Sequence, residues 1–424
     1  MKFLATSDWH IGNVFHGVDR LPEHRHFLKW LKAQIVEQRP DVLLVAGDVF
    51  DNGNPSAAAQ ALYYEFLAEV TTACPWLQLV ITAGNHDSAH RLEAPRALLH
   101  RHQVEVRGSV HRRWEPDGEG GGQWLTDFDD LIVPVTSADG NEHAVVLAVP
   151  FLRSDVMVDG SYSKGVNKLL GQLTATARER YADVPLVMMT HMYATGADIA
   201  KDSSERIVIG GMEQVDMADW DVRPDYLSCG HIHKRQSVWG TQWARYTGSV
   251  LPMSFAERDY HHGVDVVNVM AGQSPKVDFL EYTPQHKLLS LPEAELKPLL
   301  KTIAETMPDR GDVQSPDEAV YVELKLLSAQ LKPEERKRIE DAVATKNAVL
   351  CRLQLVTPDL DLSSLSADKP LSTIDDVLHR DPMEALRESF LVKHRLPMSE
   401  RQEALLARII NKVKNDDDHE DTEA

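Results

Sequence analysis

The sequence has few cysteines and no long apolar segment. Its 424 residues include three cysteines, Cys74, Cys229 and Cys351, which are far apart and form no CxxC pair. This excludes a disulfide-stabilised scaffold and a zinc ribbon, and it suits a reducing cytoplasm. No apolar run approaches the roughly 18 residues that a membrane helix needs. Residues 1–10 contain Asp8 and are too polar for a signal peptide. We therefore expect a cytoplasmic protein with no membrane partner.

The sequence is also short of positive charge and of phosphate-binding loops. It carries 45 Lys and Arg residues against 65 Asp and Glu residues, which gives a formal net charge of −20. Proteins that bind nucleic acid usually present a basic surface, so this acidity argues weakly against such binding. The dipeptide Gly-Lys does not occur, which excludes a Walker A loop and ATP hydrolysis by the chain itself. The glycine-rich segment 115–123 is expected to be a surface turn or hairpin insertion.

The first half of the sequence alternates short apolar runs with segments of helical periodicity. Short, branched and nearly continuous apolar runs are typical of buried strands. Between the first three runs, apolar residues recur at helical spacing, as Leu62, Phe66 and Val70 do. This order predicts an α/β layered domain whose last, closely spaced strands are antiparallel. The predicted strands are 3–7, 41–46, 77–83, 144–151, 185–190, 226–229, 245–250 and 263–270, and the predicted helices are 22–38 and 55–73.

The composition changes after about residue 283, which predicts a second, small domain. A strand over 319–326 is followed by a charged helix over 332–345 and a strand over 347–356. This β-α-β unit, with a helix over 295–306 in front of it, indicates an α+β capping domain.

The C-terminal part is predicted to be a linker, two helices and a tail. Residues 358–370 are rich in Pro, Asp and Ser, and 372–391 and 398–414 are amphipathic helical segments. The two helices form either a hairpin on the small domain or a docking site for a partner. The expected divisions of the chain are 1–282, 283–362, 363–414 and a disordered acidic tail, 415–424.

Five short polar motifs each follow an apolar run directly. Their side chains emerge where strands end, and in α/β sheets that edge is where ligands bind. Loops that a rigid sheet holds there can bring distant residues together. The motifs are Asp8-Trp9-His10, Gly47-Asp48, Gly84-Asn85-His86-Asp87, His191 and Gly230-His231-Ile232-His233.

The motifs supply seven oxygen or imidazole ligands and no thiolate. This mixture suits hard or borderline divalent cations such as Mn²⁺ better than a closed zinc site. Seven ligands exceed what one cation needs, but they fit two cations that share Asp48 as a bridging carboxylate. Two cations about 3.5–4 Å apart can activate water and neutralise phosphate oxygens for an in-line displacement at phosphorus. The candidate ligands are Asp8, His10, Asp48, Asn85, His191, His231 and His233.

One histidine is left over for chemistry. His86 follows the candidate ligand Asn85 and is placed to touch the substrate and transfer a proton. Each motif alone is more often a turn or a cap than a metal site. Five motifs in one order, each at a strand end, favour the metal interpretation.

The motifs resemble the signature of the calcineurin-like metallophosphoesterases. Over about residues 1–280 the sequence around the motifs resembles more specifically the SbcD family, the nuclease subunits of bacterial SbcCD complexes. Beyond that range only the layout is similar, a small capping domain followed by helices. The segments that carry the resemblance are TSDWHIG at 6–12, VAGDVFDNGNPS at 45–56, AGNHDS at 83–88, CGHIHKRQ at 229–236 and TGSVLPMSF at 247–255.

The resemblance implies a layered sandwich of two mixed β-sheets flanked by helices, and it implies roles for single residues. It assigns one cation to Asp8, His10, Asp48 and His233, and the other to Asp48, Asn85, His191 and His231. It also implies that His86 contacts the scissile phosphate and assists the leaving oxygen, with Asp87 in support. Some relatives have a histidine where this chain has Asp51, so an auxiliary substrate contact is not carried over to that position.

The resemblance further implies an activity and partners. Members of the family are Mn²⁺-dependent nucleases that act on DNA as double-strand exonucleases and as single-strand or hairpin endonucleases. They work with an SbcC-like ATPase in repair, recombination and replication, which fits the missing Walker A loop. A homodimer within a heterotetramer is implied through the helices over 55–73 and 91–101, although these helices could equally just cover the sheet. The candidate dimer residues are Leu62, Phe66, Leu98 and Leu99.

Two other functions compete with this interpretation. One is a phosphatase or small-molecule phosphodiesterase on the same scaffold, which the five motifs alone do not separate from a nuclease. The other is a scaffold that has lost its metals, against which all seven ligands count. The additional histidines His16, His24 and His26 are expected to face solvent because the metal sites are already filled. Cys229 is expected to be a core residue.

Overall fold

The computed structural model divides the chain into two compact units, Met1–Leu289 and Ser290–Ala424. The predicted linker at 358–370 and tail at 415–424 lie outside the described residues, as does most of the predicted C-terminal helices. The structure describes residues 1–117, 121–199, 214–217, 220, 223–312, 318–328, 330–356, 383, 386, 387, 390, 398 and 402–408.

The first sheet of the larger unit has six strands in the order β16-β15-β1-β4-β5-β6. β1, β4, β5 and β6 run parallel. The first three coincide with the predicted apolar runs that precede the first three motifs, whereas β6 was not predicted. β15 pairs antiparallel with β1, as predicted for this part of the chain, and β16, which was not predicted, pairs antiparallel with β15. The bounds are β1 (Lys2–Thr6), β4 (Val42–Ala46), β5 (Gln78–Thr82), β6 (Val104–Arg107), β15 (His262–Asn268) and β16 (Lys276–Tyr282).

The second sheet also has six strands, in the order β13-β14-β12-β11-β10-β9. β10, β11, β12 and β14 are parallel, so the prediction of antiparallel pairing is wrong for β12 and β14. The chain between them crosses over and contributes β13, which takes the antiparallel place beside β14. The bounds are β9 (Ile132–Thr136), β10 (His143–Ala148), β11 (Leu186–His191), β12 (Tyr226–Gly230), β13 (Gln236–Ser237) and β14 (Ala244–Tyr246).

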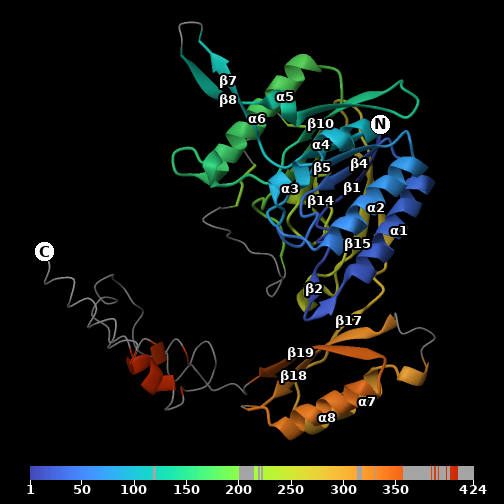
Figure 1. Cartoon of the computed structure of the whole chain (residues 1–424), viewed down its shortest axis with the longest axis vertical. Helices are drawn as coiled ribbons and strands as arrows, with labels where there is room; N and C mark the ends of the chain where they lie inside the picture. Colours follow the sequence, from blue (N-terminus) through green and yellow to red (C-terminus); the bar gives the residue numbers. More distant parts are fainter. Residues whose placement is uncertain are drawn as a thin grey trace, which may run out of the picture. The chain divides into compact units, whose positions relative to one another are not determined.

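Alternating side chains on these strands build a four-layer sandwich. On β4, Leu44 packs in the core between the two sheets, and Leu43 and Val45 pack toward helices on the outside. Helices α1 (Leu21–Gln38) and α2 (Ala57–Ala73) cover the first sheet, and α6 (Tyr162–Arg180) covers the second (Figure 1). The predicted layered fold of two mixed sheets flanked by helices is confirmed.

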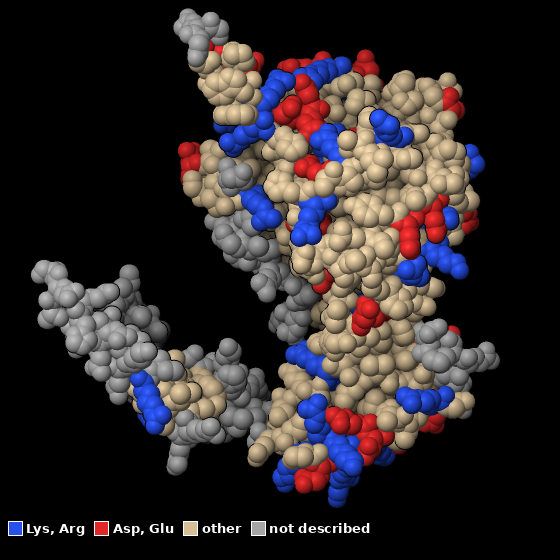
Figure 2. Space-filling model, in the orientation of Figure 1, with Lys and Arg blue, Asp and Glu red and all other residues tan. Residues whose placement is uncertain are grey.

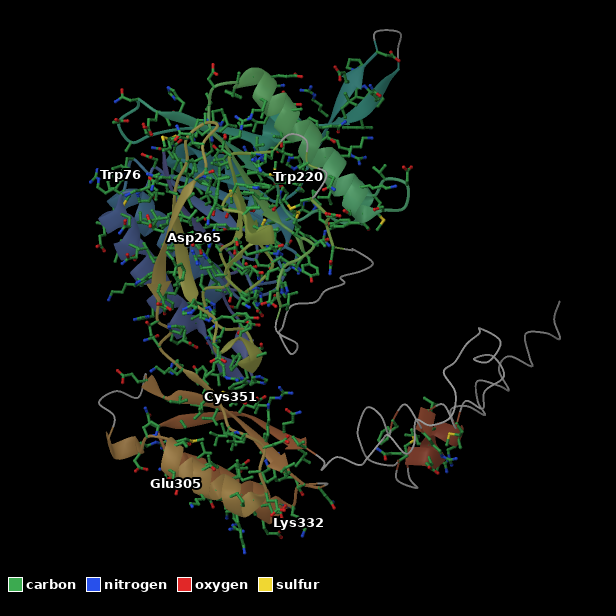
Figure 3. All side chains as sticks on the ribbon, turned by 180° about the vertical axis from the view of Figure 1, so that it is seen from behind. Trp76, Trp220, Asp265, Glu305, Lys332 and Cys351 are labelled. Atoms are coloured by element: carbon green, nitrogen blue, oxygen red, sulfur yellow. The ribbon has the colours of Figure 1, made fainter. Side chains whose placement is uncertain are left out.

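A buried ion pair joins the two sheets. Asp265 on β15 is fully buried among the strands (Figure 3). Its carboxylate accepts from Nε of Arg235, just before β13, at 2.7 Å and from Nε of Arg245, on β14, at 3.2 Å. Burial raises the pKa of Asp265, and the two guanidinium groups oppose that rise. Because the arginines come from the second sheet and the carboxylate from the first, the contact helps to fix how the sheets pack on each other.

Shorter elements connect the layers. Strands β7 and β8, which hold the two described ends of the glycine-rich segment, pair antiparallel in a hairpin that projects from the unit, in line with the predicted hairpin insertion (Figure 1). Leu62, Phe66 and Leu99 are buried within the chain, whereas Leu98 is 64% exposed. The bounds are β2 (Val14–Phe15), β3 (Val18–Asp19), α3 (Ala89–Glu93), α4 (Arg96–Leu99), β7 (Arg112–Pro116), β8 (Gly122–Thr126) and α5 (Phe128–Leu131).

The smaller unit contains the predicted β-α-β arrangement. Its sheet has the order β17-β18-β19, and β18 and β19 are parallel. Buried Leu299 and Ile303 of α7, and Ile339 and Val343 of α8, form the apolar faces of the two helices. The bounds are β17 (Leu288–Ser290), α7 (Leu296–Thr306), β18 (Val320–Leu327), α8 (Pro333–Ala344) and β19 (Ala348–Val356).

The expectation that His24 faces solvent is wrong. His24 is buried, and its ring nitrogens lie 2.9 Å from the Arg20 carbonyl and 2.8 Å from the Trp9 carbonyl. It shares the inner face of α1 with Phe27 and Leu31, at helical spacing. His16 and His26 are exposed and Cys229 is buried, as expected. No helix in the described part of the chain is long and apolar enough to cross a membrane.

Candidate metal centre

The candidate ligands come from the carboxyl ends of five strands, three in the first sheet and two in the second. The loops after β1, β4 and β5 face those after β11 and β12, so polar side chains from both sheets gather at one edge of the sandwich. Asp8 and His10 follow β1, Asp48 follows β4, Asn85 follows β5, His191 ends β11, and His231 and His233 follow β12.

Glycines let these loops approach each other closely. A Cβ on Gly84 would lie 2.1 Å from Oδ1 of Asp48, and one on Gly230 would lie 1.9 Å from the Ala46 carbonyl oxygen. Backbone hydrogen bonds also cross between loops, from Asp8 N–H to the Gly47 carbonyl at 3.1 Å. Only glycine fits at these points, which explains the glycines in the motifs.

Four candidate ligands have strained backbone. Their φ angles lie in the left-handed region that L side chains rarely adopt, at 51° for Asp8, 47° for His10, 48° for Asp48 and 94° for His231. Such residues cost on the order of 1–3 kcal/mol each and persist only where surrounding contacts hold them. Strain of this kind concentrates at functional sites, and here it turns the side chains toward a common centre.

Two groups of ligand atoms meet at Asp48. On one side, Nε2 of His191 lies 3.3 Å from Oδ2 of Asp48 and 2.9 Å from Oδ1 of Asn85. Nδ1 of His231 lies 3.0 Å from the same Asn85 oxygen. On the other side, Nε2 of His10 lies 3.6 Å from Oδ2 of Asp48. Potential ligand atoms of Asp8, His10 and His233 all lie within 4.8 Å of one another. The structure therefore brings all seven predicted ligands together, with Asp48 between the two groups.

The candidate ligands are buried in a way that favours the binding of cations. Asp8 is 0% and Asp48 1% exposed, and no Lys or Arg among the described residues pairs with either carboxylate within 4.0 Å. Both ring nitrogens of His10 are buried and have no hydrogen-bond partner in the described part of the chain. Buried carboxylates and imidazole nitrogens left in this state are costly unless a cation takes them up.

The protonation of the cluster reflects the same crowding. Burial raises the pKa of Asp8. Burial also acts to raise the pKa of Asp48, but the neighbouring His191 and His10 hold it below its usual range. Burial acts to lower the pKa of His191, whereas Asp48 and Asp8 raise it to about 9. Because a metal ligand must be a neutral imidazole, a cation at this position displaces the His191 proton.

His86 differs from the ligands because its side chain is exposed. Nδ1 of its ring lies 2.8 Å from the Asp51 carbonyl oxygen, so Nδ1 donates and Nε2 is the nitrogen available to a substrate. Its backbone N–H donates to Oδ1 of Asp48 at 2.8 Å. The backbone of Asp51 therefore orients His86, a role that sequence reasoning did not give to this position.

Asp87 supports the loops rather than the His86 ring. Its carboxylate accepts from the backbone N–H groups of Val49 at 3.1 Å, Phe50 at 2.9 Å and Gly84 at 2.9 Å. Burial and the nearby Asp48 raise the pKa of Asp87 to about 6, against these hydrogen bonds. Asp87 thus ties the loop after β4 to the loop after β5.

One residue at the centre was missed from the sequence. Oε2 of Glu257 lies 3.3 Å from Nδ1 of the candidate ligand His233, and Glu257 is fully buried. The only signal was its place two residues after the segment 247–255, which was noted for its resemblance but given no role.

Comparison with known proteins agrees with this geometry. The profile of the calcineurin-like phosphoesterases matches residues 1–235. The SbcD subunit of the SbcCD nuclease from Rhodobacter capsulatus is 32% identical over 400 residues, covering 91% of this chain and 93% of its own. Its namesake in Escherichia coli K12 is 29% identical, covering 80% and 81%, and that of Bacillus subtilis is 30% identical, covering 71% and 72%.

The chain therefore belongs to the calcineurin-like phosphoesterases and, within them, to the family of SbcD nuclease subunits. Members of the phosphoesterase family bind divalent metal ions, and the clusters of Asp and His side chains described above are where this chain can hold them.

Added Mn²⁺ is expected to stabilise the protein against heat in a concentration-dependent way, because only the folded state holds the cluster together. A cation at 100 times its dissociation constant contributes about 2.7 kcal/mol. Asp48→Asn removes the shared carboxylate and should abolish most of the shift, which differential scanning fluorimetry measures. Asp259→Asn, at an exposed carboxylate, is the matched control and should keep the shift. A full shift in the Asp48 variant would contradict the assignment.

Proposed function

We propose that the chain is a metal-dependent DNA nuclease that hydrolyses phosphodiesters as a double-strand exonuclease and as a single-strand or hairpin endonuclease. The observation that carries this function is the exposed His86 beside a buried cluster of two carboxylates, an amide and four histidines. The similarity to proteins named as SbcCD nuclease subunits, over nine-tenths of both chains for the first relative, supports DNA as the substrate. The roles implied are in DNA repair, recombination and replication.

We assign one cation to Asp8, His10, Asp48 and His233 and the other to Asp48, Asn85, His191 and His231. The oxygen and imidazole donors, without thiolate, favour Mn²⁺. When bound, the two cations supply Lewis-acid activation of water and neutralise charge on the phosphate oxygens. The protein's part is to hold a carboxylate between them and to fix each imidazole by its second nitrogen or by packing.

The chain's own residues then carry the proton. Water attacks the phosphorus in line with the leaving oxygen and gives up a proton to the solvent, the P–O bond to the leaving oxygen breaks, and that oxygen needs a proton. His86 is exposed and its Nε2 is the ring nitrogen available to a substrate, so in this proposal it contacts the scissile phosphate and assists the leaving oxygen through Nε2–H. The Asp51 carbonyl keeps Nδ1 as the second donor and holds the ring in place. Asp87 acts through the backbone by keeping the two loops in register.

We further propose an ATPase of the SbcC type as the partner. On the face drawn in Figure 2, Lys and Arg alternate with Asp and Glu over the described surface without a continuous basic stripe. A chain with net charge −20 should hold DNA weakly alone, so the partner supplies much of the grip. We assign residues 1–282 to the nuclease domain, 283–362 to the cap and 363–414 to SbcC docking. A homodimer within a heterotetramer in the cytoplasm completes the proposal.

His86→Ala is expected to keep Mn²⁺ binding and to lose DNA cleavage, by about 10²–10⁴-fold if His86 acts as the proton donor. The assay uses purified protein, Mn²⁺, labelled linear duplex, a labelled hairpin and a generic phosphate monoester, with calorimetry for the metal. His90→Ala, at an exposed histidine four residues on, is the control.

Two results would count against these assignments. Lost Mn²⁺ binding in His86→Ala would make His86 a ligand, which its distance to His10 and Asp48 also allows. Cleavage of the ester without cleavage of DNA, even with the ATPase partner added, would favour a phosphatase or small-molecule phosphodiesterase.

Removal of residues 371–424 is expected to leave Mn²⁺-dependent cleavage intact and to abolish association with the ATPase, because the seven ligands all lie in the larger unit. Pull-down with the tagged ATPase measures association, and the full-length chain is the reference. Undiminished pull-down by the shortened chain would refute the docking assignment.

A further inference from the structure

The loop after β14 holds no candidate ligand, yet it lies against one. It runs from Thr247 to a 3₁₀ turn at Phe255–Glu257, and the Glu257 side chain is completely buried. Burial of a carboxylate costs several kcal/mol unless specific contacts compensate for it. The contacts of Glu257 therefore indicate why this sequence places an acid here.

The loop itself fixes the orientation of the carboxylate. Oε2 accepts from the backbone N–H of Met253 at 2.8 Å, and Oε1 accepts from the Ser254 hydroxyl at 3.1 Å. The loop is tied in turn to α1, because the buried guanidinium of Arg20 pairs with Glu23 and donates to the Pro252 carbonyl. The carboxylate is thus held in place by groups other than His233.

The third contact of the carboxylate reaches the metal centre. Oε2 lies 3.3 Å from Nδ1 of His233, and the His233 ring packs edge-on against His10 with centroids 5.2 Å apart. A histidine that donates Nδ1–H coordinates through Nε2. A carboxylate partner in that position fixes the tautomer and ring orientation and makes the imidazole a better ligand.

His191, a candidate ligand of the second cation, is oriented by a similar but weaker hydrogen bond. Nδ1 of His191 lies 3.0 Å from the Ala46 carbonyl, a neutral acceptor that orients the ring. The two proposed cation positions therefore differ in the charge behind a ligand histidine, with a full carboxylate behind His233 and a neutral carbonyl behind His191.

We propose that Glu257 is a positioning residue for the cation held by Asp8, His10 and His233, which accepts the Nδ1–H of His233 and presents Nε2 to the cation. This inference rests on the proposed two-cation centre. It also explains the position of the 247–257 segment, which brings no ligand of its own.

The test is calorimetric titration of the full chain with Mn²⁺, alongside thermal unfolding in excess EDTA. Glu257→Gln keeps an acceptor oxygen but loses the charge, and Glu257→Leu loses both. We expect the affinity of one of two Mn²⁺ sites to fall by about tenfold in the Gln variant and about 100-fold in the Leu variant. The Mn²⁺ affinity of the other site should stay near the wild-type value. The midpoint of thermal unfolding of the Gln variant in EDTA should also stay near that of the wild type. Glu281→Gln, which removes an exposed Glu–His contact of 2.7 Å, is the matched control and should change neither site.

Two results would overturn the inference. One is wild-type affinity at both sites in a folded Glu257→Gln protein. The other is an equal loss at both sites together with a lower midpoint in EDTA, which marks a purely structural carboxylate. A wild-type chain that binds no Mn²⁺ would instead overturn the proposed function, and the two failures are thereby distinguished.

Discussion

The rest of this structure depends on two carboxylates that are buried close together without a Lys or Arg among the described residues to neutralise them. Asp8 and Asp48 lie under the loops of both sheets, where no Lys or Arg of the described chain pairs with them. Ionised carboxylates in such surroundings are costly, and histidines offset the cost only in part. Divalent cations meet the requirement fully, which makes the centre a place for metal rather than for a folded-in salt bridge.

The surrounding fold is arranged to maintain this unfavourable grouping. Left-handed backbone at Asp8, His10 and Asp48 aims their side chains inward, and glycines at 84 and 230 allow the loops to meet. Neither sheet could form the centre alone, since Asp48 comes from one and His191 from the other. The large cores on both sides of the sheets hold the strand ends rigid, and the stability that they contribute maintains the strain at the centre.

The sequence was most informative where an apolar run stops at a polar motif. That pattern located the ends of β1, β4, β5, β11 and β12, and with them the seven candidate ligands that the structure brings together, because strand ends and turn chemistry are local features. Other features depend on tertiary contacts. β6 and β9 are short strands, and β9 contains Pro134, so their local patterns are weak. α6 was not predicted either, although Val166, Leu170 and Leu173 recur on it at helical spacing. The parallel pairing of β14 with β12 depends on a crossover that no local signal encodes.

Single residues show the same division. His24 was expected to face solvent, but its position on the inner face of α1 buries it. Glu257 is separated by 24 residues from His233, and it meets that ligand because the loop after β14 folds back on the site. Asp51 acts through its backbone carbonyl, which its side chain cannot reveal. Supporting contacts of this kind depend on the tertiary fold, whereas the candidate ligands belong to short sequence motifs.

Both sheets are proposed to share one bridged pair of cations, and the rest of the mechanism depends on that pair. The most direct measurement is anomalous X-ray diffraction at the manganese edge from crystals grown with Mn²⁺. We expect two peaks about 3.5–4 Å apart, both in contact with the Asp48 carboxylate. A single peak, or peaks that do not touch Asp48, would contradict the bridged pair.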